Sequence, residues 1–215
     1  MKAIQLAVVT GQHPFEVQEF QRMFNSFTGI ETYPQNMELF VQTEKAVRQS
    51  YDVILFYNFH RQTPGESAQG FDLAMKAALE ELGETRQGIF ILHHAILAFP
   101  AWSTWAELTG IGDRSHSNLA NQTVRAEVVN RSHPVTAGLE EWEMVDETYK
   151  MKDPGLDCTP LLITRHPLSM RILAWTKTYR QARVLCYQSG HDQTAYRHPS
   201  FRQFLRQGIT WLAGR

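Results

Sequence analysis

The sequence has little cysteine: only Cys158 and Cys186 occur among its 215 residues. Two thiols are too few for a disulfide framework, and they lack the close spacing of a zinc knuckle. The sequence therefore predicts a protein of the cytoplasm in which both thiols are buried.

The sequence also lacks long apolar runs and an excess of positive charge. The first segment, MKAIQLAVVTGQ, has only a short apolar stretch before Thr10 and Gly11, too short for a signal peptide or a membrane span. The formal net charge is −1, which leaves no extended basic field to neutralise nucleic-acid phosphates. We therefore expect neither a membrane nor a nucleic acid as a partner.

Buried strands and amphipathic helices alternate along the first half of the chain. Hydrophobic residues make up 43% of the sequence and charged residues 20%, enough apolar surface for an ordered core. Runs that are apolar without alternation are typical of parallel strands covered on both faces, and they lie at residues 3–9, 52–56, 88–92 and 182–187. Helical stripes at residues 20–27, 71–82 and 199–212 provide the covering layers. This pattern predicts a doubly wound α/β fold.

The pattern weakens between residues 111 and 149. There GDRSHSNLANQ, residues 112–122, is interpreted as a polar loop, and residues 123–129 as a short strand. Two further strands are predicted at residues 160–164 and 172–178. We expect residues 111–149 to leave the sheet and pass over a pocket.

Polar residues follow several of the predicted buried strands, where a doubly wound sheet holds its ligands. His13 follows the first strand, His60 the next, His93 and His94 a third, and His191 with Asp192 the last long one. These side chains are therefore predicted to meet in one pocket.

Neighbouring imidazoles suit either proton transfer or metal ligation. His93 and His94 point to opposite sides if strand geometry persists there, so one of them is expected to pack structurally. A divalent metal such as zinc is one interpretation, with ligands drawn from a carboxylate and from His13, His60, His93 or His94, and His191. However, no pair of them shows the helical spacing that marks a zinc motif.

Two further features have open interpretations. Asp146-Glu147-Thr148-Tyr149 either supplies an acid or base to the pocket or forms an ordinary polar turn. Trp102 and Tyr149 either offer flat faces to a sugar ring or belong to the core.

Taken together, six segments resemble the trehalose-utilisation (ThuA-like) family. They are GQH ending at His13, HHAI from His93, HPVTAGL from His133, DETY from Asp146, GHD from Gly190 and GITWLAG from Gly208. The resemblance implies one ThuA-like domain over residues 1–215, with a flavodoxin-like three-layer α/β/α architecture and a mostly parallel sheet. It also implies the fold of class I glutamine amidotransferases.

The resemblance implies carbohydrate chemistry without amidotransferase activity. In true class I amidotransferases a nucleophilic cysteine occupies the turn after the central strand, where this chain has His93, so no thiolate is placed to attack. His191 and Asp192 resemble, in their position in the chain, the amidotransferase histidine and the acid that follows it.

Our main functional hypothesis is proton transfer beside the carbonyl of a trehalose-related or keto-sugar. His191 is the predicted base, Asp192 or Glu147 orients it, and His93 polarises the carbonyl. The predicted substrate-binding residues are His13, His60, His94, Trp102 and Tyr149. Alternatives are a non-catalytic sugar-binding sensor and a metal-assisted hydrolase. The expected partner is a small carbohydrate, and base rates for symmetric assemblies favour a homodimer.

Overall fold

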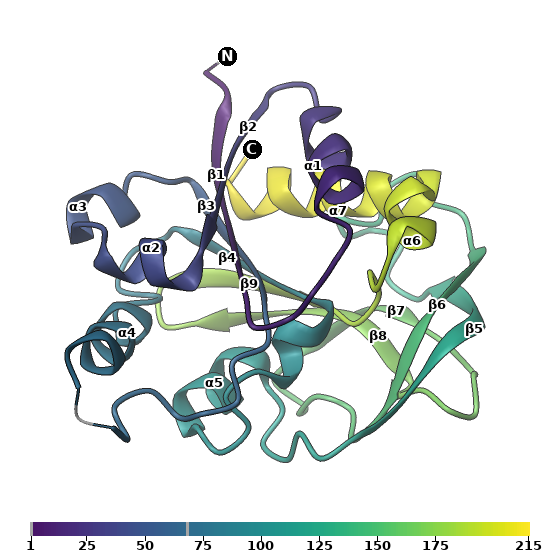
Figure 1. Ribbon diagram of the computed structural model, residues 1–215. Coiled ribbons are helices and arrows are strands. Elements are labelled where there is room, and N and C mark those ends of the chain that lie inside the picture. The colour runs from purple at the N-terminus through teal and green to yellow at the C-terminus, as the bar shows by residue number, and fades with distance from the viewer. Residues whose placement is uncertain (1, 68) are drawn as a thin grey trace.

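A nine-stranded mixed sheet runs through the molecule, in the order β2-β1-β3-β4-β9-β8-β7-β5-β6 (Figure 1). The computed structural model describes residues 2–67 and 69–215. The strands are β1 (Ile4–Gly11), β2 (Ile30–Asn36), β3 (Val53–Asn58), β4 (Gly88–Leu92), β5 (Ser117–Val128), β6 (Trp142–Lys150), β7 (Thr159–Ile163), β8 (Ile172–Tyr179) and β9 (Ala182–Tyr187).

Strands β2, β1, β3, β4 and β9 form the parallel half of the sheet. Successive side chains of β1 enter two different cores: Leu6 and Val8 lie in one, Ala7 and Val9 in the other. This period of two explains why the parallel strands are apolar without alternation in polarity. The predicted three-layer α/β/α fold with a mostly parallel sheet is confirmed for this half.

Helices cover both faces of the sheet, as Figure 1 shows. Helices α1 (Val17–Asn25), α6 (Gln193–Arg197) and α7 (Pro199–Leu212) lie on one face, and α2 (Met37–Gln42), α4 (Gly70–Glu80) and α5 (Ser103–Thr109) on the other. The short α3 (Lys45–Arg48) follows α2. The apolar stripes drive this docking: Phe20 of α1 and Phe201 of α7 are buried in one core, and Met75 of α4 in the other.

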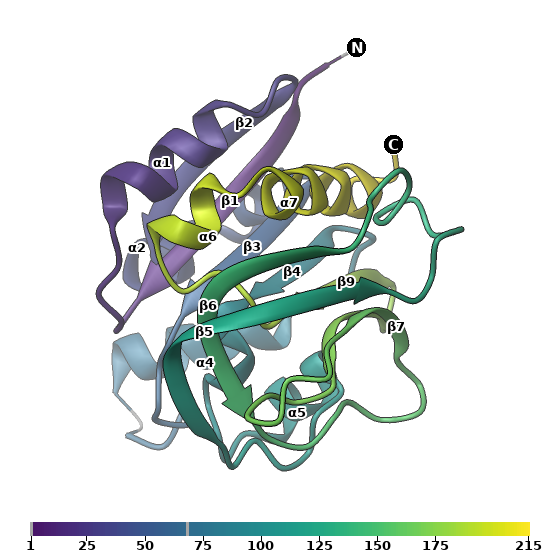
Figure 2. The ribbon, with the colours of Figure 1, turned by 90° about the vertical axis from the view of Figure 1, so that its right-hand side faces the viewer.

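The second half of the sheet, from β9 through β8, β7 and β5 to β6, is antiparallel. Strands β5 and β6 form a long twisted ribbon at one side of the molecule (Figure 2). Two interpretations of the sequence are wrong here. Residues 117–122, expected in a loop, open β5, and Asp146–Tyr149 lie within β6 and not in a turn.

Strand β2 was not predicted from the sequence. It contains Pro34 and is largely exposed, as befits an edge strand, where a missing N–H is tolerated. Across residues 2–67 and 69–215, none of the helices combines the length and the apolar character that a bilayer crossing requires.

Candidate functional site

The site forms around the turn that follows β4. His93 comes directly after the last residue of this strand, opens the short 3-10 helix η1 (His93–Leu97) and has a φ of +53°. A left-handed conformation is uncommon for a residue with a Cβ, and its strain is found at functional sites more often than elsewhere. The turn is therefore a sharp strand-to-helix elbow with an imidazole at its tip.

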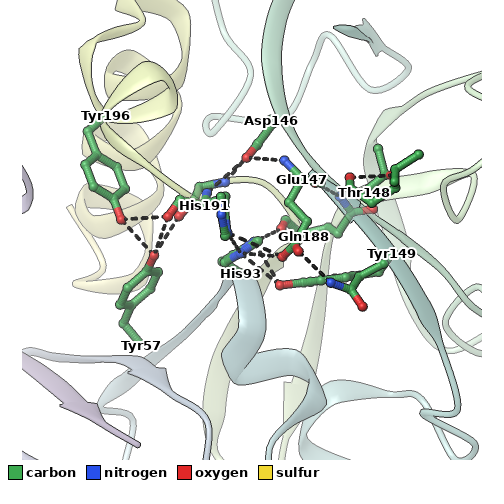
Figure 3. A network of polar contacts seen from close by, with 12 residues as sticks. Tyr57, His93, Asp146, Glu147, Thr148, Tyr149, Gln188, His191 and Tyr196 are labelled. Carbon is green, nitrogen blue, oxygen red and sulfur yellow. Dashed lines mark hydrogen bonds and ion pairs between the residues drawn. The ribbon is translucent and has the colours of Figure 1, made fainter. Parts of the chain in front are cut away.

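Three side chains converge at this elbow (Figure 3). His93 Nε2 lies 3.3 Å from Glu147 Oε2 and 3.3 Å from His191 Nδ1. His191 Nδ1 lies 3.4 Å from the same Oε2 atom. The three atoms form a nearly equilateral triangle, which we call the HEH centre.

The topology of the sheet explains why residues so distant in sequence meet. Strands β4 and β9 are parallel neighbours, so the residues that follow them, His93 and His191, emerge at the same edge. Glu147 and Tyr149 are two residues apart on β6 and so share one face of that strand. The antiparallel half of the sheet brings this face of β6 to the elbow. His93, His191 and Glu147 therefore meet at the strand ends, where the sequence predicted a pocket.

Hydrogen bonds determine which nitrogen of His93 carries the proton. Its Nδ1 atom lies 2.7 Å from the backbone carbonyl oxygen of Gln188. A carbonyl oxygen only accepts, so Nδ1 is the donor and Nε2 keeps its lone pair toward the HEH centre. The hydroxyl of Tyr149 donates to that lone pair at 2.8 Å.

Glu147 is held by a second strand. Asn118 of β5, which pairs with Tyr149 in the ribbon, donates from Nδ2 to Glu147 Oε1 at 2.7 Å. This hydrogen bond leaves the other carboxylate oxygen, Oε2, for the two imidazoles. The Glu147 side chain is only 9% exposed.

The preceding residue, Asp146, positions the turn after β9. Its carboxylate accepts hydrogen bonds from the backbone N–H groups of Gly190 (2.8 Å), His191 (3.0 Å) and Glu147 (2.9 Å). Burial raises the pKa of Asp146, whereas the charge of His93 and these N–H donors oppose that rise. Asp146 thus ties β6 to the loop that carries His191.

The charges within the HEH centre favour an ionised carboxylate. Burial works to raise the pKa of Glu147, but the contacts of its carboxylate with the rings of His191 and His93 and the hydrogen bond from Asn118 outweigh burial and hold the pKa below the usual range. The hydrogen bond to Glu147 raises the pKa of His191. Burial, together with the charge of Glu147, raises the pKa of the Tyr149 phenol, so this hydroxyl acts as a hydrogen-bond donor.

The HEH centre has the dimensions of a metal site. Ligand atoms bound about 2.0–2.1 Å from a tetrahedral Zn²⁺ lie about 3.3–3.4 Å from one another, and the HEH centre has separations of 3.3, 3.3 and 3.4 Å. An octahedral ion with similar bonds needs neighbouring ligands about 2.9 Å apart. Among the described residues, this is the group whose ligand atoms could hold an ion.

The hydrogen-bonded surroundings match what metal ligands require. A ligating histidine usually donates its other ring N–H to a carbonyl or carboxylate, and a ligating carboxylate is itself hydrogen-bonded. The Gln188 carbonyl does this for His93, and Asn118 does it for Glu147. Two histidines and one carboxylate also leave a fourth position for water or substrate, as catalytic zinc sites do.

His13 and His94 lie beside the HEH centre without joining it. Their rings stack with centroids 4.1 Å apart, and His13 lies 6.4 Å from the ring of His191. Burial lowers the pKa of both rings. Neither ring nitrogen of His94, nor Nδ1 of His13, has a hydrogen-bond partner among the described residues. His94 is the structurally packed member of the His93–His94 pair.

His60 lies apart from the HEH centre. It stacks on Phe99 and lines a separate cavity of about 440 Å³ with Gln12, Gln62 and others. Its Nδ1 contacts the Asn58 amide at 3.2 Å. His60 therefore does not belong to the group that could hold an ion.

Trp102 and Asp192 also lie outside the HEH centre. Trp102 is 7% exposed and packs on Phe99 in the core, so it does not present a face to a sugar beside His93. Asp192 caps α6 by accepting from the backbone N–H of Thr194 at 2.7 Å, which gives it a structural role at the start of that helix.

Sequence reasoning missed Asn118 and Gln188. Asn118 lies in a largely polar stretch, where nothing in the sequence distinguishes it from its neighbours. Gln188 contributes a backbone carbonyl, which any residue could supply. Tyr57 was also missed; its hydroxyl contacts Tyr196 at 2.8 Å and donates to the carbonyl of Gly190 at 2.8 Å, which steadies the loop before His191 (Figure 3).

Comparison with solved structures agrees with this architecture. A ThuA-like protein from Parabacteroides merdae is 19% identical and has a TM-score of 0.78, with 99% of this chain and 90% of that chain covered. A ThuA-like protein from Bacteroides uniformis is 20% identical, with a TM-score of 0.74 and coverage of 99% and 93%. A glutamine amidotransferase from Thermotoga maritima is 8% identical, with a TM-score of 0.58 and coverage of 98% and 99%.

These likenesses show the fold that was predicted, the flavodoxin-like fold shared with class I amidotransferases. A search of curated proteins finds no match. At the level of sequence, residues 9–212 match the profile of the ThuA family, described as trehalose utilisation. The chain therefore belongs to the ThuA family.

Proposed function

We propose that this protein acts on a trehalose-related sugar that carries a carbonyl group, by moving a proton from the carbon beside that carbonyl. We further propose that a divalent ion held by the HEH centre polarises the carbonyl. The observation that carries the proposal is the triangle of His93 Nε2, Glu147 Oε2 and His191 Nδ1 at a strained elbow. Membership of a family described as trehalose utilisation supports a sugar as the substrate class.

The chemistry follows from where negative charge develops. Removal of the proton leaves an enediolate whose negative charge rests on the former carbonyl oxygen. A divalent ion held by His93, Glu147 and His191 would supply the positive charge that stabilises this oxygen. The Tyr149 hydroxyl, 2.8 Å from His93 Nε2, is close enough to the HEH centre to donate a hydrogen bond to the same oxygen. The half-buried His13 has its ring edge-on to that of His191, with centroids 6.4 Å apart, and we assign proton transfer to it.

The proposed function does not include amidotransferase activity, because no cysteine nucleophile is available. The elbow carries His93, and both cysteines are buried. Burial raises the pKa of Cys158 to about 11 and that of Cys186 well above its usual value. Neither thiol is a thiolate nucleophile near neutral pH. Buried, unpaired thiols also support the cytoplasm as the location we propose.

A metal-free version of the same reaction is the second candidate. It uses His191 as the base, Glu147 to orient it and His93 to polarise the carbonyl, for which His93 must carry a proton on Nε2 as well as on Nδ1. The contact of His191 Nδ1 with Glu147 Oε2 at 3.4 Å favours this version. Glu147 takes the orienting role here in place of Asp192, because Glu147 contacts His191 whereas Asp192 Oδ1 accepts from the backbone N–H of Thr194. The metal content of the purified protein separates the two versions.

Deuterium exchange tests the proposed reaction directly. The protein is incubated in D₂O with keto-sugars related to trehalose, and NMR follows loss of the proton beside the carbonyl. We expect exchange with the wild type and a loss of at least about 100-fold in rate for His93→Gln. His133→Gln, a histidine that packs on Trp211, is the matched control and keeps the wild-type rate.

Two outcomes would overturn the proposal. Equal exchange rates for the wild type and His93→Gln would remove the elbow from the reaction. Ligand-induced stabilisation of the protein, with neither exchange nor turnover for any sugar, would replace the enzyme with a sugar-binding sensor.

A further inference from the structure

We infer that a cationic cavity formed by Arg61, Arg114 and His116 binds an anionic group, phosphate or carboxylate, on the substrate. The inference rests on the proposed function in one respect only, namely that the bound anion belongs to the substrate of the HEH centre. Binding of the anion itself depends only on the cavity.

The cavity has a volume of about 340 Å³. Its remaining lining residues are Leu97, Pro100, Gly112, Asp113 and Ser115. The His116 ring packs edge-on against Tyr149, with centroids 5.7 Å apart, and the Tyr149 hydroxyl contacts His93 Nε2 at 2.8 Å. Two side chains in contact, His116 of the cavity wall and Tyr149, therefore link the cavity to the HEH centre.

Arg114 is a buried cation without a carboxylate partner in the part of the chain that the structure describes. It is 4% exposed, and its guanidinium donates to the carbonyl oxygens of Ile111 (2.9 Å) and Phe99 (2.6 Å). Its Nε has no hydrogen-bond partner among those residues. Burial lowers the pKa of Arg114 to about 10. A buried charge paired only with dipoles is costly, and a bound anion offsets that cost.

The other charges around the cavity favour an anion as well. Arg61 is exposed, packs over the ring of Phe59 at 5.0 Å and forms no ion pair with the described residues. The acidic member of the lining, Asp113, is bonded to Lys152 Nζ at 2.9 Å, so its charge is compensated. The net field in the cavity is therefore positive.

The chemistry of these groups selects the ligand class. Arg61 presents an exposed planar guanidinium group, which suits the oxygen pairs of phosphate and carboxylate, and the buried Arg114 adds positive charge to the cavity wall. An anion in this cavity holds the sugar at a fixed distance from Tyr149 and His93. We therefore expect a sugar phosphate or a sugar acid as the substrate, in preference to a neutral disaccharide.

The test uses the arginine Nε–H signals of the full-length, chelator-treated protein in NMR titrations with inorganic phosphate and, separately, with acetate. We expect saturable shifts of the Arg61 and Arg114 signals. Arg61→Gln weakens the binding at least about fivefold. Arg206→Gln, which removes an exposed charge from α7, leaves it unchanged. The anion that binds with the higher affinity shows whether the cavity prefers phosphate or carboxylate.

Equal affinity in the wild type and Arg61→Gln, or shifts that do not saturate, would overturn the inference. The kinetic readout is separate: Arg61→Gln should raise KM for anionic keto-sugars and leave KM for neutral ones unchanged. The two proposals can fail separately. If anion binding depends on Arg61 but the protein exchanges no sugar proton, the anion-binding cavity is supported and only the proposed function is refuted.

Discussion

At the scale of single residues, the important feature is an imidazole at a strained strand-to-helix elbow. His93 has a φ of +53° and points its Nε2 lone pair toward Glu147 and His191 because the Gln188 carbonyl takes its other ring proton. In the proposed function this imidazole is a metal ligand or, in the metal-free version, the group that polarises the carbonyl.

Glu147 contributes the negative charge of the HEH centre. Glu147→Gln keeps the size and shape of the side chain but replaces a carboxylate oxygen with an amide NH₂ group. We expect the affinity for zinc to fall at least about tenfold, because losing even a residue that only hydrogen-bonds to a metal ligand has an effect of this size. The measurement is metal content after dialysis against buffered zinc. Glu143→Gln, on the same strand but exposed, is the control. Unchanged zinc content in Glu147→Gln would contradict the assignment of this carboxylate.

The two cysteines should be inert in the folded protein. Burial raises the pKa of both thiols, so we expect the protein to react with a thiol reagent such as DTNB at pH 8 only after unfolding in guanidinium. Rapid labelling of either cysteine in the native state would show that its surroundings are open to solvent.

At the scale of secondary-structure elements, strand β6 is the part of the fold that creates the site. Its two-residue period places Glu147 and Tyr149 toward the elbow, while Asp146 reaches the backbone of Gly190 and His191 from the other side. One strand therefore supplies a ligand and a hydrogen-bond donor, and also positions the loop of another ligand.

Asp146→Asn tests this positioning role. An asparagine has one acceptor oxygen and an NH₂ group that faces backbone donors, so it leaves buried N–H groups unsatisfied. We expect the free energy of unfolding, measured with urea, to fall by about 3 kcal/mol. Asp113→Asn, at an exposed ion pair, should change it little. A stable Asp146→Asn variant with wild-type zinc affinity would refute the role.

The elements differ in how well the sequence predicts them. The apolar runs of β1, β3, β4 and β9 were predicted because strands covered on both faces need no polar residues. Strands β2 and β6 were missed. Strand β2 is an exposed edge strand that contains Pro34, so it lacks the apolar pattern of a buried strand. Strand β6 lacks that pattern because Asp146, Glu147 and Thr148 are polar at the positions that form the site.

At the scale of the whole molecule, the winding of the sheet makes one centre out of segments about fifty residues apart. The sequence predicted that histidines would meet at the strand ends, and His93, His191 and Glu147 do meet there. It did not predict that His60 would lie elsewhere, because the packing of His60 on Phe99 is a tertiary contact. For Trp102 the core was one of two open interpretations, and the cap that Asp192 forms with Thr194 is a local contact that was not recognised in the sequence.

The metal content and thermal stability of the protein test the central claim most directly. The protein is purified without added metal, analysed for elements, stripped with a chelator and then titrated with zinc. We predict one equivalent of bound ion for the wild type and a rise in Tm of several degrees on reloading, because an ion at 1,000 times its Kd stabilises the native state by about 4 kcal/mol. His93→Gln should lose both effects. A wild type that binds well under one equivalent and shows the same Tm with and without zinc would contradict the claim.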